Sequence, residues 1–300
     1  MSRNGANPCL SVRAPAKINL YLEVVGKRPD GYHDICTIMQ TVSLYDELSF
    51  TAREDGQVVL RASGEELPTA QENLVYRAAR LLQSRFAPAR GVSISLNKAI
   101  PVGRGLGGGS SDAAATLNAL NTLWGLGRTP EELQGMGAEL GSDVPFFIRG
   151  GTALCEGRGE RVTPCLIRGE FHYVLVLPAV HTSTAAVYAA WRHNLTTRDS
   201  GVTIEVVKEA LATGDAQRLG RGLYNGLERA AFQVSPAVHG VGELLGAATR
   251  LVGSRRVCMS GSGSAFFAVC DTPNQARDVA AQLTEEMSIP TAAVRSLPAM

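Results

Sequence analysis

A glycine-rich stretch at residues 101–112, PVGRGLGGGSSD, constrains most strongly what this chain can fold into. Glycine loses more backbone entropy on folding than any other residue, so this density indicates a backbone that must approach something closely. Residues 92–96 alternate apolar and polar side chains, as a strand does. After the glycines come helix-capping residues and then an apolar stripe at helical spacing: Ala113, Leu117, Leu120 and Trp124. A strand, a glycine loop and a helix N-terminus together offer free N–H groups and a positive dipole end, which predicts a phosphate-binding loop.

The loop differs from three well-known phosphate-binding patterns. A Walker-type loop needs a lysine before its final serine, where this chain has Gly109. Gly103, Gly105 and Gly108 fit a dinucleotide-binding fingerprint, but the acidic residue expected about 20 residues further on is missing. The HRD and DFG motifs of protein kinases do not occur in the chain. A dehydrogenase and a protein kinase are therefore disfavoured. A flexible connector is disfavoured too, because connectors seldom end at a capped helix.

Composition narrows the class of protein. The chain has 300 residues, 45% of them hydrophobic, with 29 basic and 28 acidic side chains, as expected of a globular protein with a full core. The near-neutral charge argues against a nucleic-acid partner. No apolar run reaches membrane length and the first residues lack a signal-peptide core, so the sequence predicts no membrane partner and a cytoplasmic location. The six cysteines form no CxxC pair, which is typical of free thiols in a reducing compartment.

Several polar side chains stand at positions that make them candidates for a functional role. In the strand expected at residues 11–25, Lys17 and Asn19 share one face among small and apolar neighbours. Tyr32 and His33 directly follow a Pro-Asp-Gly turn. Asp143 stands between the end of a helix expected at 129–140 and an apolar Pro-Phe-Phe run. For Lys17 and Asn19 the alternative is a solvated surface position. For Tyr32 and His33 it is a packed aromatic in a turn, and for Asp143 it is a cap or turn residue.

The remaining pattern alternates strands and helices. Strands are expected at residues 36–44, 47–52, 58–62, 153–162 (a glycine-broken pair), 171–178, 257–259, 265–270 and 291–297. Helices are expected at residues 73–84, 182–192, 203–213, 237–249 and after the cap at 272. The segment SGSGS at 260–264 is either a hairpin turn or a second group of N–H groups that binds an anion.

Three motifs then occur in a particular order: APAKINL at residues 14–20, PVGRGLGGGSSDA at 101–113, and SGSG at 260–263. On these motifs, nearly the whole chain resembles the superfamily of galactokinase, homoserine kinase, mevalonate kinase and phosphomevalonate kinase. The resemblance implies an α+β fold with two domains, which we place at residues 1–167 and 168–300. The first would be a ribosomal protein S5 domain 2-like domain with a left-handed crossover, and the second a ferredoxin-like domain.

The resemblance also implies an activity, ATP-dependent phosphorylation of an alcohol group on a small molecule. The sequences DGYH at 30–33, GGGSS at 107–111 and DVPF at 143–146 are most similar to one branch of the superfamily. That branch acts on a cytidine diphosphate-linked polyol in the non-mevalonate isoprenoid pathway. The alternatives are homoserine or mevalonate kinase, against which the pair Tyr32 and His33 argues, and a non-catalytic nucleotide-binding protein, which would need neither Lys17 nor Asp143.

Residue roles follow from the same resemblance. It implies that Lys17 and Asp143 form the catalytic pair, with Asp143 accepting the proton of the attacking hydroxyl. The residues expected to bind the cytidine end are Asn19, Tyr32, His33 and Tyr188. The residues expected to bind ATP are Asn73, Lys98, Pro101, Val102, Gly103, Arg104, Gly105, Leu106, Gly107, Gly108, Gly109, Ser110 and Ser111. The cofactors expected are ATP and Mg²⁺. Whether Ser110 or Ser111 reaches the metal stays open, as does the oligomeric state.

Overall fold

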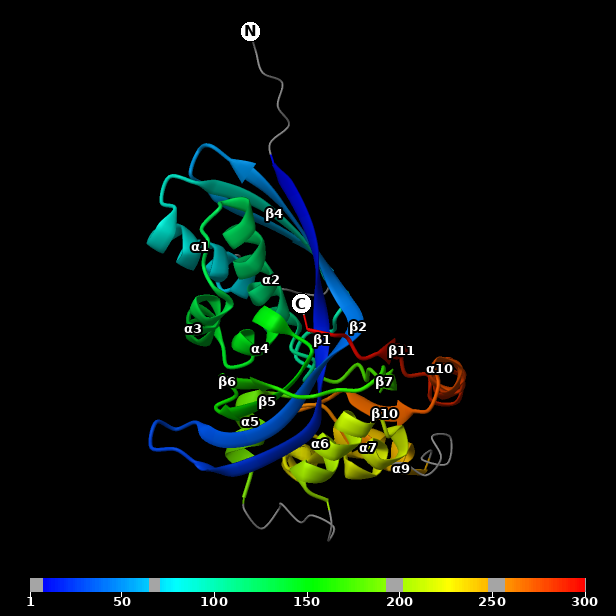
Figure 1. The fold of residues 1–300 in the computed structure, drawn as a ribbon. Helices are drawn as coiled ribbons and strands as arrows, with labels where there is room; N and C mark the ends of the chain where they lie inside the picture. Colours follow the sequence, from blue (N-terminus) through cyan, green and yellow to red (C-terminus); the bar gives the residue numbers. More distant parts are fainter. Residues whose placement is uncertain (1–7, 65–70, 193–201, 248–256, 300) are drawn as a thin grey trace. The chain divides into compact units, whose positions relative to one another are not determined.

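The computed structural model describes residues 8–64, 71–192, 202–247 and 257–299 (Figure 1). Residue contacts divide the chain into two compact units. Unit 1 comprises Met1–Ala16, Leu44–Ile100 and Gly108–Arg149, and unit 2 comprises Lys17–Ser43, Pro101–Gly107 and Gly150–Met300. Both units are discontinuous because strands β1 (Cys9–Lys27) and β2 (His33–Arg53) each contribute residues to both. The domain boundary between residues 167 and 168 stays a prediction.

Unit 1 combines sheet strands with four helices. Strand β3 (Val58–Ser63) runs parallel to β4 (Gly91–Asn97), which pairs antiparallel with the second part of β2. The helices are α1 (Leu74–Phe86), α2 (Gly108–Leu123), α3 (Pro130–Leu140) and α4 (Val144–Arg149). Helix α2 packs against α1 and α4, and the predicted stripe from Ala113 to Trp124 is buried. The loop prediction is therefore confirmed in its local outline, since β4 leads into the glycine stretch and α2 follows it.

Unit 2 contains an antiparallel sheet in the order β11-β7-β10-β9. Its strands are β7 (His172–Val176), β9 (Cys258–Met259), β10 (Phe266–Cys270) and β11 (Thr291–Arg295). The β1–β2 hairpin also lies in this unit, where β5 (Thr152–Gly157) pairs with β2, β6 (Arg161–Pro164) with β5, and β8 (Tyr224–Asn225) with β1. The helices are α5 (Thr184–Ala190), α6 (Ile204–Thr213), α7 (Ala216–Gly222), α8 (Glu228–Val234), α9 (Pro236–Ala247) and α10 (Pro273–Met287). Among the described residues, no helix is both long and apolar enough to cross a membrane.

Three local expectations were wrong or incomplete. The two strands expected at 36–44 and 47–52 form one strand, β2, because no glycine or proline interrupts residues 44–47. Helix α4 was not predicted, although Pro145 at its second position needs no N–H partner there. The short elements α7, β8 and α8 were missed as well, because each is shorter than the window of about 11–18 residues over which a hydrophobic period can be recognised. The last two residues of the helix expected at 237–249 lie outside the described part of the chain.

Candidate functional site

The glycine loop of unit 2 needs its glycines for two physical reasons. Gly103, Gly105 and Gly107 have φ angles of 67°, 77° and 71°, which side chains rarely adopt. A Cβ atom on Gly105 would lie 2.0 Å from the carbonyl oxygen of Ser260. One on Gly103 would lie 2.0 Å from Nε2 of His181. The loop is therefore built for a backbone conformation and a packing distance that only glycine allows.

Hydrogen bonds fix the loop's carbonyl groups within unit 2. The backbone N–H of Lys17 donates to the Leu106 carbonyl at 2.9 Å. Ser260 Oγ donates to the Gly105 carbonyl at 2.9 Å, and the Ala265 N–H donates to the Arg104 carbonyl at 3.1 Å. With these carbonyls bonded to protein, the loop presents a defined backbone. The Arg104 side chain, which is among the residues expected to bind ATP, donates from Nη1 to the Leu177 carbonyl at 3.2 Å.

Lys17 and Asn19 are buried together, as their shared strand face indicates. Their exposed fractions are 3% and 1%. Lys17 Nζ donates to Asn19 Oδ1 at 2.6 Å, and Asn19 Nδ2 donates to Thr37 Oγ1 at 2.9 Å. A Cβ atom on Gly261 would lie 3.3 Å from Lys17 Nζ, so the ammonium also borders the SGSGS segment. Burying an ammonium costs free energy unless it is hydrogen-bonded, so the network holds Lys17 in one orientation.

The SGSGS segment connects β9 to β10 as a hairpin turn. The Ser260 N–H donates to the Ala265 carbonyl at 2.9 Å, and the Gly263 N–H to the Ser260 carbonyl at 3.0 Å. Asn225, which sequence reasoning missed, braces the turn by donating from Nδ2 to the carbonyls of Met259 and Gly261 at 2.7 and 2.8 Å. The turn thus supports the glycine loop. Anion binding by its N–H groups stays a prediction.

Aromatic side chains gather near the tip of the β1–β2 hairpin. The His33 ring lies 5.1 Å from the ring of Tyr188 and 5.6 Å from that of Trp191, between centroids. Tyr32 is 53% exposed, and the guanidinium of Arg158 lies 4.9 Å from its ring centroid. Burial, with a smaller contribution from the charge of Lys27, lowers the pKa of His33. The structure therefore brings together two of the predicted residues, His33 and Tyr188. It adds Trp191, which lies three residues after Tyr188 and was missed.

Unit 1 holds the other predicted residues. Asn73 caps α1, where its Oδ1 accepts from the Val75 N–H at 2.9 Å. Asp143 lies half-buried between α3 and α4. Ser111 Oγ is buried and has no hydrogen-bond partner among the described residues, whereas Ser110 is half-buried. Because Lys17 belongs to unit 2 and Asp143 to unit 1, their pairing stays a prediction.

Lys98 is engaged in a charge cluster that the sequence did not predict. Its Nζ donates to Asp112 Oδ2 at 2.9 Å and forms an ion pair with Asp46. The pKa of Asp112 is raised to about 7, chiefly by burial and in smaller part by the charge of Asp46, against the opposing charge of Lys98. The sequence offers two signals. One is an acid at residue 46, between the strands expected at 36–44 and 47–52, and the other is the acid at residue 112, which follows two serines and looks like a cap residue.

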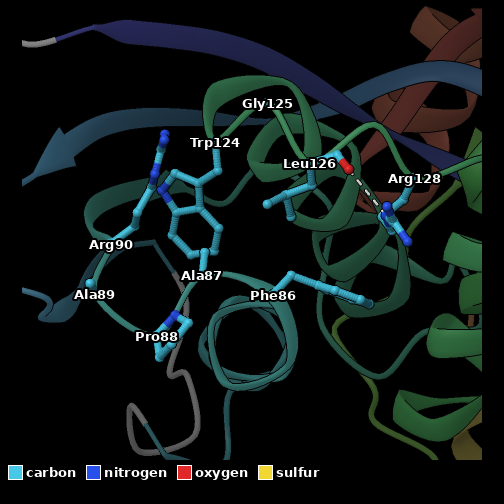
Figure 2. A pocket seen from close by; sticks show the side chains of 9 residues that line it. All are labelled: Phe86, Ala87, Pro88, Ala89, Arg90, Trp124, Gly125, Leu126 and Arg128. Carbon is cyan, nitrogen blue, oxygen red and sulfur yellow. Dashed lines mark hydrogen bonds between the residues drawn. The ribbon is translucent and has the colours of Figure 1, made fainter.

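A separate pocket of about 470 Å³ lies in unit 1, near the C-terminal ends of α1 and α2 (Figure 2). None of the predicted site residues lines it. Arg128 donates from Nε to the Leu126 carbonyl at 3.1 Å, drawn as a dashed line in Figure 2, and its guanidinium lies 5.1 Å from the Phe86 ring centroid. Trp124 Nε1 is buried and has no hydrogen-bond partner among the described residues. We assign no ligand to this pocket.

Known families match both halves of the chain. Residues 73–151 match the family described as GHMP kinases N terminal domain, and residues 207–289 match GHMP kinases C terminal. These matches, together with the mixed α+β fold, identify a small-molecule kinase, and the chain belongs to the GHMP kinase family. Kinases of this family use ATP as the phosphate donor. The predicted fold class is confirmed.

The similar proteins are more specific. The chain is 43% identical over 260 residues to 4-diphosphocytidyl-2-C-methyl-D-erythritol kinase of Brevibacillus brevis, covering 87% of each chain. It is 38% identical over 288 residues to the kinase of the same name from Nostoc sp., covering 91% of this chain and 90% of that one. A crystal structure of 4-(cytidine 5'-diphospho)-2C-methyl-D-erythritol kinase superposes with a TM-score of 0.78 at 37% identity, covering 96% of this chain and 99% of that one. Homoserine kinase from Cytophaga hutchinsonii shares the fold, with a TM-score of 0.75 at 17% identity, covering 100% and 98%.

Proposed function

We propose that this protein transfers the terminal phosphoryl group of ATP to the 2-hydroxyl of 4-(cytidine 5'-diphospho)-2-C-methyl-D-erythritol, in the non-mevalonate isoprenoid pathway. The observation that carries the proposal is the His33–Tyr188 pair near the hairpin tip, in a chain whose relatives bear that enzyme's name. A phosphate loop alone would suit many kinases. A base-reading imidazole beside aromatic rings favours a cytidyl substrate over homoserine or mevalonate.

The glycine loop and the start of α2 are proposed to hold the ATP phosphates, because loop N–H groups and a helix N-terminus attract anions. Asn73 and Lys98 stay candidates on the nucleotide side. Mg²⁺ would add charge neutralisation between the phosphate oxygens. Among the described residues no group of three or more His, Cys, Asp or Glu side chains suits a metal ion. A hydroxyl of Ser110 or Ser111 could serve as the protein ligand, since Mg²⁺ in kinases takes few protein ligands beside phosphates and water.

The catalytic step is proposed to rest on Lys17 and Asp143. The substrate hydroxyl oxygen forms a bond to the terminal phosphorus, the bond from that phosphorus to the ADP oxygen breaks, and Asp143 accepts the hydroxyl proton. The ammonium of Lys17, held by Asn19, would orient the carboxylate and offset the developing negative charge. Phosphoryl transfer depends mainly on such positioning and neutralisation.

The cytidine end is proposed to meet Asn19, Tyr32, His33 and Tyr188. The pKa of His33 is lowered, so its ring is neutral at pH 7 and offers one donor and one acceptor nitrogen to the edge of a base. The exposed Tyr32 ring and the Tyr188 ring offer faces for stacking. All six cysteines are free thiols, which supports our placing the reaction in the cytoplasm.

The test is ADP release by the purified protein with Mg²⁺-ATP, comparing the cytidyl substrate with homoserine and mevalonate. We expect ADP release with the cytidyl substrate and a kcat/KM for the other two that is lower by at least about 10⁴, because unpaired buried polar groups penalise wrong substrates. Comparable rates with homoserine or mevalonate would contradict the proposal.

A further inference from the structure

A buried charge cluster in unit 1 consists of Asp46, Lys98 and Asp112. Their side chains are 0%, 4% and 3% exposed. Asp46 lies on β2, Lys98 follows β4, and Asp112 lies on α2. Buried charges are retained when they are paired, and removing one partner leaves the other uncompensated. The cluster therefore connects β2, the end of β4 and α2.

One carboxylate of the cluster fixes the start of the glycine loop. Asp46 Oδ1 accepts from the backbone N–H groups of Ala99 and Ile100, at 2.6 and 2.8 Å. These two residues directly precede Pro101. Hydrogen bonds from backbone N–H groups to a carboxylate are charge-assisted and short. Asp46 thus holds the chain at the point where it leaves β4 and enters the loop.

The other carboxylate fixes the end of the loop. Asp112 lies within the second turn of α2, whose first residue is Gly108. A Cβ atom on Gly108 would lie 3.0 Å from Lys98 Nζ, so the ammonium packs directly against the beginning of the helix. Through Lys98, the segment before residue 101 and the helix after residue 107 are joined by charge.

The cluster carries two carboxylates for one ammonium. Asp112 Oδ1 has no hydrogen-bond partner among the described residues. Burial, with the charge of Asp46, raises the pKa of Asp112 to about 7 against the opposing charge of Lys98.

We propose that Asp46, Lys98 and Asp112 are positioning residues that clamp the two ends of the glycine loop, and that Lys98 supports nucleotide binding through the loop rather than by touching the nucleotide. Only the use of the loop for ATP rests on the proposed function. The clamp itself is a property of the nucleotide-free protein.

The test combines hydrogen exchange with calorimetry. Amide exchange of peptides covering residues 99–109 is measured without nucleotide, and ATP affinity is measured separately. For Asp46→Asn we expect loop exchange and the Kd for ATP each to rise about tenfold or more, because small misplacements in a preorganised site are costly. The KM for the cytidyl substrate should change less than about threefold. The matched control is Arg85→Met, which breaks the exposed Arg85–Glu139 pair of the same unit and should change none of these quantities.

Asp112→Asn serves as the second variant, since it keeps the side-chain shape and leaves the Asp46–Lys98 pair intact. We expect it to speed loop exchange, because it removes the charge that links α2 to Lys98. Unchanged loop exchange in both folded aspartate variants would overturn the clamp. So would Lys98→Met, if ATP affinity fell while loop exchange stayed the same, because Lys98 would then contact the nucleotide directly. If the wild type releases no ADP while loop exchange responds as expected, the proposed function fails and the clamp stands.

Discussion

The glycine loop and the tip of the β1–β2 hairpin, both in unit 2, are built in opposite ways. The loop is packed so closely that a single Cβ atom would meet backbone at 2.0 Å, and its carbonyls are bonded to protein. At the hairpin tip, Gly31 has nothing within 4 Å of an added Cβ atom, and Tyr32 is 53% exposed. The loop proposed to bind phosphate is thus fixed in advance, whereas the hairpin tip proposed to bind the base leaves its aromatic face accessible. The difference suits a family that shares one phosphate donor and varies the acceptor.

The largest expected effect concerns Asp143, which belongs to neither the glycine loop nor the hairpin tip and would show that turnover needs more than these two regions. Asp143→Asn keeps the shape and removes the charge, so kcat should fall by about 10²–10⁴ while ATP affinity changes little. Steady-state kinetics and calorimetry give the two quantities. Lys17→Ala should be severe as well, and the double variant should lose far less than the sum, since groups that act as a unit are not additive. Fully additive losses would mean that Lys17 and Asp143 work independently.

The second prediction compares one glycine from each region. Gly105→Ala forces a side chain into a positive φ and against the Ser260 carbonyl, so we expect the Kd for ATP to rise about a hundredfold. Gly31→Ala, with φ of 87° and open space, is the matched control and should leave ATP affinity within about threefold. Calorimetry on variants whose circular dichroism shows folding decides it. If Gly31→Ala lost as much ATP affinity as Gly105→Ala, the positive φ angle that both glycines share, and not the close packing of the loop, would explain the loss.

The third prediction concerns Tyr32, at the exposed tip of the β1–β2 hairpin. Base stacking is worth about 1–3 kcal/mol in nucleic-acid complexes, so Tyr32→Ala should raise the KM for the cytidyl substrate by about one to two decades. The KM for ATP should stay nearly unchanged. Tyr32→Phe retains the ring face and should behave almost as the wild type. An equal rise in both KM values would make Tyr32 a structural aromatic and remove it from the substrate site.

Sequence reasoning succeeded where the signal was local. The strand–glycines–helix order, the helix expected at 129–140, and the shared face of Lys17 and Asn19 all depend on spacing along one element. It failed where the partner is distant in sequence. Asp46 and Lys98 are 52 positions apart, and Ser260 and Gly105 are 155 positions apart, so no periodicity relates them. Long-range packing decides those contacts.

The smallest expected effect concerns Asp112, a buried ionisable residue near the start of the helix that follows the glycine loop. Because the folded-state pKa of Asp112 is raised from 3.8 to about 7, the folded protein holds a proton that the unfolded chain has released between those values. This contribution to stability is full below about pH 4 and is lost as the pH rises through 7. Relative to Asp112→Asn, the wild type should therefore lose about 2–3 kcal/mol of unfolding free energy between pH 5 and 8, measured in urea. A constant difference across that range would contradict the assignment.

The most direct test of the central claim is the position of the phosphate in the product. The purified protein is incubated with Mg²⁺-ATP and 4-(cytidine 5'-diphospho)-2-C-methyl-D-erythritol, and the product is followed by phosphorus NMR alongside ADP release. We expect a new phosphomonoester on the 2-hydroxyl, formed in a one-to-one ratio with ADP. ADP release without that phosphomonoester, or a phosphomonoester formed only from homoserine or mevalonate, would contradict the account of a fixed phosphate loop coupled to a cytidine-reading hairpin.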